Sequence, residues 1–114
     1  GKDELFVKNI ISYVEENITS NSLSVTELGQ YIGLSRSSLH KKLKTVTGLG
    51  PNEFIKLIRL KAAAKLLNEG KHNISEVCYL SGFSSPSYFS KCFQLQFNMT
   101  PSEFVAESMG QKNQ

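Results

Sequence analysis

Residues 33–54, GLSRSSLHKKLKTVTGLGPNEF, and residues 82–104, GFSSPSYFSKCFQLQFNMTPSEF, follow the same pattern of glycines, serines, prolines and apolar residues. The copies are offset by 49 residues up to the serine after the glycine and by 50 residues beyond it, which puts one extra residue in the second copy, near Ser85 and Pro86. In each copy the glycine allows the backbone to reverse, and the apolar residue after it fills the angle between two helices. Each copy is therefore predicted to be a helix-turn-helix, produced by an internal repeat.

Helical periodicity and helix-ending residues occur along the whole chain, whereas no segment alternates strictly between apolar and polar residues. We expect an all-α fold of seven helices, in which two helix-turn-helix subdomains are joined by a long linker helix. The expected parts are a first subdomain at residues 1–50, the linker helix at residues 51–70, a second subdomain at residues 71–109 and a disordered tail at residues 110–114.

Residues near the helix ends support these boundaries. Three capping pairs place an N-cap residue three positions before a glutamate: Ser24 with Glu27, Asn73 with Glu76 and Thr100 with Glu103. In the first helix, the expected buried stripe includes Leu5, Ile10 and Val14, and the stretch Thr19-Ser20-Asn21-Ser22 predicts the turn that follows it.

The linker helix begins at Pro51, where a missing amide hydrogen costs nothing. It is apolar over most of its circumference, so we expect it to pack on two sides. At about 1.5 Å per residue, the helix would be about 28 Å long, comparable with the roughly 34 Å between successive faces of one major groove.

The 114 residues are 39% hydrophobic and contain neither an apolar run long enough to span a membrane nor a secretion signal. We therefore expect a cytoplasmic protein. Cys78 and Cys92 lack the spacing of a zinc site, and two cysteines are weak support for a disulfide framework, so both are interpreted as helix residues. No cofactor or metal is expected.

The net charge of +3 is unevenly distributed. Residues 1–35 carry a net charge of −3, residues 36–71 a net charge of +7 and residues 72–114 a net charge of −1. A central basic block is typical of a surface that binds a polyanion. Solvated lysines on exposed helix faces would produce the same block, so charge alone does not decide.

The helix at about residues 36–47 should bury Leu39, Leu43 and Val46, spaced four and three apart. Its outward side chains carry no carboxylate and suit DNA bases or phosphates; they are Arg36, Ser37, His40, Lys41 and Lys44. The helix at about residues 86–97 should bury its phenylalanines. Its outward side chains are less charged; they are Ser87, Ser90, Lys91 and Gln94. Because the two outer faces differ, we expect the halves to read different sequences rather than a palindrome.

Two other classes of function are alternatives to DNA binding. The first is a helical protein-interaction module whose basic block binds an acidic partner, and this alternative stays open. The second is an enzyme, which is not expected. His40 and His72 are the only histidines, neither has a nucleophile or metal partner at a recognisable spacing, and the sequence has no glycine-rich phosphate loop.

The sequence resembles the DNA-binding domain of the AraC family of bacterial transcription regulators. The resemblance extends over about residues 5–107 and is carried by Ile74-x-Glu76-Val77, Gly82-Phe83-Ser84, Ser87-Tyr88-Phe89-Ser90-Lys91-x-Phe93, Thr100-Pro101-Ser102-Glu103-Phe104 and Ile58-Arg59-Leu60-Lys61-x-Ala63. More narrowly, Gly48-x-x-Pro51-x-Glu53-Phe54-Ile55 with Ser90-Lys91-Cys92-Phe93 is similar to the output domain of Bacteroides-type hybrid two-component sensors.

The resemblance implies sequence-specific binding of double-stranded DNA, by two recognition helices in successive major-groove segments. It assigns base reading to positions matching Ser37, His40 and Lys41 in the first helix and Ser87 and Lys91 in the second. It also implies that the chain is the output module of a larger regulator whose remaining part lies N-terminal to it, with RNA polymerase as a further partner.

Several positions depart from the family pattern. Lys41 and Lys91 stand where arginine is common, and lysine cannot make the planar two-pronged contact with guanine, so reading there should be less strict. Gly29 and Cys78 stand where alanine is common. Asn98 replaces a glycine, but asparagine tolerates the left-handed conformation, so the fold should be unaffected.

Overall fold

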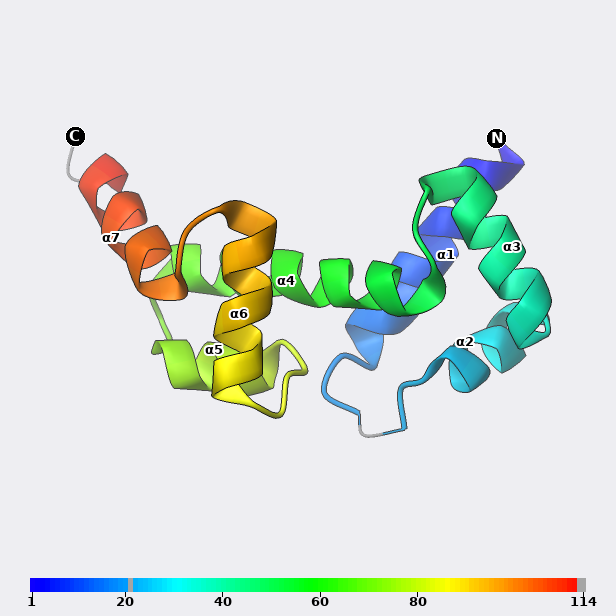
Figure 1. Cartoon of the computed structure of the whole chain (residues 1–114), viewed down its shortest axis with the longest axis horizontal. Coiled ribbons are helices and arrows are strands. Elements are labelled where there is room, and N and C mark those ends of the chain that lie inside the picture. The colour runs from blue at the N-terminus through cyan, green and yellow to red at the C-terminus, as the bar shows by residue number, and fades with distance from the viewer. Residues whose placement is uncertain (21, 113–114) are drawn as a thin grey trace. The chain divides into compact units, whose positions relative to one another are not determined.

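A computed structural model describes residues 1–20 and 22–112 of the chain. Within these ranges the protein consists of seven helices and has no strand, which confirms the all-α prediction (Figure 1). The helices are α1 (Lys2–Glu16), α2 (Val25–Ile32), α3 (Arg36–Thr47), α4 (Pro51–Glu69), α5 (Ile74–Leu80), α6 (Pro86–Phe97) and α7 (Pro101–Lys112).

The last helix is longer than expected. α7 continues through Gly110 to Lys112, so residues 110–112 of the expected tail are helical. A glycine inside a helix costs only about 1 kcal/mol relative to alanine, and no proline follows to end the helix. Residues 113 and 114 of the expected tail, and Asn21 of the expected turn, lie outside the described residues.

The chain divides into two compact units, Gly1–Ile58 and Arg59–Gln114. α4 contributes to both, because its first half supplies Phe54, Ile55 and Ile58 to the core of the first unit. Its second half supplies Leu60, Ala63 and Leu67 to the core of the second unit. The apolar side chains of α4 are thus shared between two cores, one at each half of the helix.

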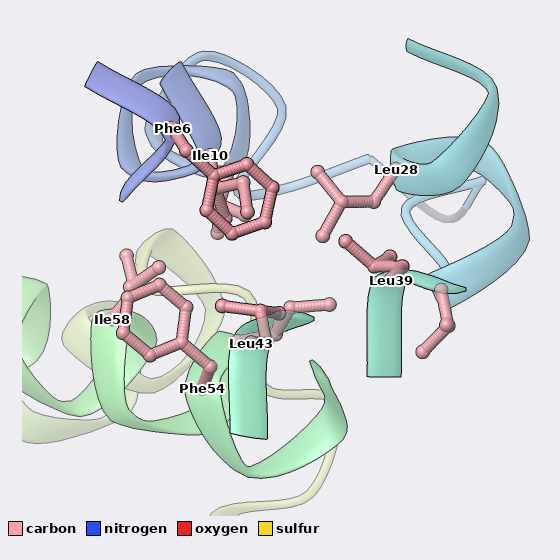
Figure 2. Close-up of a cluster of buried hydrophobic side chains, with 10 residues drawn as sticks. Phe6, Ile10, Leu28, Leu39, Leu43, Phe54 and Ile58 are labelled. Carbon is pink, nitrogen blue, oxygen red and sulfur yellow. The ribbon is translucent and has the colours of Figure 1, made fainter. Parts of the chain in front are cut away.

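The core of the first unit is built from aliphatic side chains and two phenylalanines (Figure 2). Side chains from α1, α2, α3 and α4 point toward one another there; the labelled ones are Phe6, Ile10, Leu28, Leu39, Leu43, Phe54 and Ile58. Leu5, expected in the buried stripe of the first helix, is 59% exposed. The stripe of α1 follows Phe6, Ile10 and Val14, which places Leu5 beside the core rather than in it.

The core of the second unit is more aromatic. Phe89 and Phe93 of α6 are fully buried, with ring centroids 5.8 Å apart. Phe104 of α7 meets Phe93 edge to face, at a centroid distance of 5.4 Å. Cys78 and Cys92 are free and buried in α5 and α6, as expected for helix residues.

The two turns between the paired helices share a backbone hydrogen bond and a glycine with a positive φ angle. Gly33 and Gly82 adopt positive φ angles of 84° and 94°. The Leu34 N–H donates to the Gly29 carbonyl over 2.9 Å, and the Phe83 N–H donates to the Cys78 carbonyl over 3.0 Å. The predicted repeat is therefore a repeat of structure as well as of sequence.

The extra residue of the second copy is Ser84. Ser35 caps α3 by accepting a hydrogen bond from the Ser38 N–H over 3.1 Å. In the second copy the cap is Ser85, which accepts from the Tyr88 N–H over 3.3 Å. The inserted residue therefore lies between Phe83 and this cap, just before the position expected from the sequence.

Candidate nucleic-acid interface

The buried side chains of α3 fix the rotation of the helix about its own axis. Leu39 and Leu43, one helical turn apart, are fully buried in the core of the first unit. Val46, expected beside them, is only partly buried. The Ser35 cap and the left-handed Gly48, with φ of 81°, set where the helix begins and ends. The opposite face of α3 is therefore presented in a fixed register.

The predicted outward side chains of α3 are all exposed: Arg36, Ser37, His40, Lys41 and Lys44. The helix has no acidic residue, and among the described residues none of its four cations forms an ion pair with a carboxylate. Arg36, Lys41 and Lys44 can therefore bind phosphate, and arginine and lysine can also donate to guanine O6 and N7 in the major groove.

His40 lies at the edge of this face, against the turn that leads into α4. A Cβ atom on Gly50 would lie 3.2 Å from Cε1 of the imidazole. The same Cβ atom would lie 3.5 Å from Oε1 of Glu53, an oxygen that accepts a hydrogen bond from the Gly50 N–H over 3.3 Å. Glycine at residue 50 leaves the space in which the ring of His40 rests.

α6 is fixed in the same way as α3. Phe89 and Phe93 are fully buried, and Phe97 is partly buried. Pro86 occupies the first turn, where proline suits a helix. Asn98 ends the helix in the left-handed conformation, with φ of 59°, as expected for a residue that replaces glycine.

The outer face of α6 matches the prediction with one difference. Ser87, Lys91 and Gln94 are exposed, whereas Ser90 is only partly exposed because it lies next to the buried Phe89 at the edge of the face. Lys91 is the only cation of this helix, and α6 has no acidic residue. α6 therefore presents one positive charge where α3 presents several.

Two large hydrophobic side chains on α6 are exposed and lie outside the predicted set of outward residues. Leu95 is 76% exposed and Tyr88 is 53% exposed. A side-chain hydrogen bond to Cys92 raises the pKa of Tyr88. The signal for Leu95 was its position directly after Gln94, outside the stripe of phenylalanines spaced four apart.

Lys42 is the remaining cation of α3, and its side chain does not join the outward set. Its Nζ lies over the ring of Phe6 from α1, 4.4 Å from the ring centroid. Such a cation–π contact is worth about 0.5–1 kcal/mol at an exposed site. One of the four cations of α3 is thus held toward α1.

The described part of the chain has no group of three histidine, cysteine, aspartate or glutamate side chains placed to hold a metal ion. In the same part, no helix combines the length and the apolar character needed to cross a membrane.

Comparison with known proteins identifies the family. Residues 28–107 match the family of helix-turn-helix domains. The chain is 48% identical over 102 residues to histidine kinase P4 of Formosa agariphila, covering 90% of this chain and 7% of that protein. It is 30% identical over 95 residues to the HTH-type transcriptional activator RhaS of Salmonella schwarzengrund, covering 83% of this chain and 34% of that protein.

Among solved structures, the fold is similar to that of a transcriptional regulator from Chromobacterium violaceum, described as an AraC-type DNA-binding domain-containing protein. The TM-score is 0.81 with 32% sequence identity, and the match covers 87% of this chain and 88% of the other. This family consists of DNA-binding domains of transcription regulators and not of enzymes. With its two helix-turn-helix units and this pattern of relatives, the chain belongs to the AraC-type helix-turn-helix family.

Proposed function

We propose that the chain binds double-stranded DNA sequence-specifically, with α3 and α6 as recognition helices in successive major-groove segments. The observation that carries this proposal is the outer face of α3, where five exposed polar or basic side chains stand without a carboxylate on the same helix. A helix docked in the major groove needs such a face.

In this proposal α3 makes more charged contacts with DNA than α6 does. Arg36, Lys41 and Lys44 give α3 the stronger attraction to phosphate, and Ser37 and His40 add groups that can reach base edges. α6 contributes Lys91, together with Ser87, Gln94 and the partly exposed Ser90. α6 would then read its segment with fewer charged contacts and more through water.

The chain covers only a small part of the relatives whose sequences it matches, so we further propose that it is the output module of a larger regulator. The kinase among these relatives favours a two-component regulator. Contact with RNA polymerase, a remainder of the regulator on the N-terminal side and a cytoplasmic location, where bacterial DNA is found, belong to the same proposal.

Selection from a library of duplexes with a random central segment, followed by binding in a salt series, tests the DNA proposal. We expect a preferred sequence and a steep loss of affinity with salt, because each neutralised phosphate releases counterions. Replacement of Lys44 by alanine should make the slope of log affinity against log salt shallower by about 1. The matched control is Lys8→Ala, an exposed lysine on α1.

Absence of binding to any duplex at low salt would contradict the proposal. Binding without any preferred sequence would contradict sequence-specific recognition. An unchanged salt slope in Lys44→Ala would contradict the assignment of DNA contact to the outer face of α3. A helical module that binds an acidic protein, the competing function, would show no enriched sequence in the selection.

A further inference from the structure

A groove in the first unit lies away from the outward set of α3. It has a volume of about 520 Å³ and is lined by Lys2, Leu5, Phe6, Asn9, Tyr31, Ile32, Leu34 and Lys42. All of these residues belong to Gly1–Ile58, and they come from α1, α2, the turn after α2 and the inner edge of α3. None belongs to the outward set to which we assign DNA contact.

The groove is apolar at its exposed edges. Leu5 is 59% exposed and Tyr31 is 60% exposed, although both are large side chains that usually lose exposure in a folded domain. The ring of Tyr31 stacks on Tyr13 at a centroid distance of 4.3 Å, which holds it in one orientation. The groove therefore presents two large exposed apolar side chains, and one of them, Tyr31, is held in place by stacking.

The groove also carries positive charge without a partner. Lys42 is held above Phe6, and Lys2 is the other basic residue of the lining. Among the described residues neither ammonium group forms an ion pair, and no carboxylate lines the groove. An incoming carboxylate would thus meet two unpaired cations beside apolar side chains.

We propose that this groove is a docking surface for an acidic amphipathic segment of a partner protein. Apolar side chains of the segment would pack on Leu5 and Tyr31, and its carboxylates would pair with Lys2 and Lys42. This combination is the way amphipathic helices bind to grooves: apolar anchors supply affinity, and complementary charges supply orientation. Because the groove is separate from the outward set of α3, such a partner could bind while DNA is bound.

The test uses two labelled synthetic helical peptides of the same length, one of leucine and glutamate and one of leucine and lysine, titrated into the whole chain by fluorescence anisotropy. We expect the acidic peptide to bind and the basic peptide to bind at least about tenfold more weakly. Leu5→Asp and Lys42→Met should each weaken binding of the acidic peptide by about fivefold or more.

Each variant has a matched control. Met109→Asp changes an apolar side chain with the same 59% exposure in the second unit, and Lys8→Met removes an exposed lysine from α1 outside the groove. Both controls should bind the acidic peptide as the unaltered chain does. Circular dichroism should show that all four variants remain helical, so that a loss of binding reports on the groove.

Failure of the acidic peptide to bind at millimolar concentration would overturn the proposal. So would equal affinity for the two peptides, or equal effects of Leu5→Asp and Met109→Asp. Affinity of Leu5→Asp for the selected duplex should be unchanged. If the unaltered chain bound no duplex but bound the acidic peptide with this pattern of variant effects, the proposal of DNA binding would be wrong. The proposal of a docking groove would still be supported.

Discussion

A Cβ atom on Gly29 would lie 2.7 Å from the carbonyl oxygen of Leu34. The contact lies inside the turn of the first helix-turn-helix, where the Leu34 N–H donates back to the Gly29 carbonyl over 2.9 Å. In the second unit the same position is Cys78, whose Sγ is 3.9 Å from the Phe83 carbonyl oxygen. The two turns share this backbone hydrogen bond, but Gly29 has no Cβ atom, whereas Cys78 carries a side chain at the equivalent position.

Replacement of Gly29 by alanine should therefore destabilise the chain. Alanine favours helix by about 1 kcal/mol over glycine, but crowding against a backbone carbonyl that cannot swing away costs about 1–3 kcal/mol. Gly110→Ala, in α7, is the matched control, because nothing lies within 4 Å of a Cβ atom there. Thermal unfolding should show a lower Tm for Gly29→Ala and an unchanged or higher Tm for Gly110→Ala; equal shifts of the same sign would contradict the crowding.

The contact between Gly50 and His40 makes a prediction about DNA reading. Gly50→Ala should displace the imidazole by a few tenths of an ångström or more, because the Cβ atom would lie 3.2 Å from Cε1. We expect weaker binding to the selected duplex with little change in Tm, since a side-chain end can move aside. In a His40→Ala background the same change should have almost no further effect on affinity. Additive losses in the double variant would mean that Gly50 acts independently of His40.

The cap of α7 should make stability depend on pH. Hydrogen bonds from the backbone and side chain of Thr100 lower the pKa of Glu103. The stabilisation is therefore fully present above the ordinary pKa of a glutamate in the unfolded chain, and it disappears as the pH falls through the lower pKa of the folded state. At pH 7, Glu103→Gln should have a lower Tm than the unaltered chain, and the difference should vanish at low pH.

The control for this pH dependence is Glu107→Gln, which removes the same charge from an exposed position outside the cap of α7. Its Tm difference from the unaltered chain should be smaller at pH 7. A Tm difference for Glu103→Gln that stayed constant from pH 7 to pH 2 would show that the cap carboxylate does not contribute in its charged form.

Local signals in the sequence predicted the helices that matter for function. α3 (Arg36–Thr47) and α6 (Pro86–Phe97) cover the residue ranges expected from the sequence. Each helix begins after a serine cap and ends at a residue in the left-handed conformation. The alternation of buried and outward positions in these helices also follows from spacing alone, since Leu39, Leu43, Phe89 and Phe93 are buried as expected.

What the sequence did not predict depends on packing between elements. Leu5 is exposed because the core follows Phe6 and not its neighbour. Lys42 lies over Phe6, a residue 36 positions away, and no local pattern marks that contact. Ser90 is only partly exposed because it lies at the edge of its face, and no local pattern marks the approach of His40 to Gly50.

The most direct test of the central claim maps where each recognition helix acts on one selected duplex. Base-by-base interference footprints would be compared for the unaltered chain, Lys41→Ala and Lys91→Ala. If α3 and α6 occupy successive major-groove segments, the two variants should lose contacts at separate groups of base pairs, about one helical turn of roughly 10 base pairs apart. Loss of contacts at the same base pairs in both variants, or no loss in either, would contradict the two-helix account.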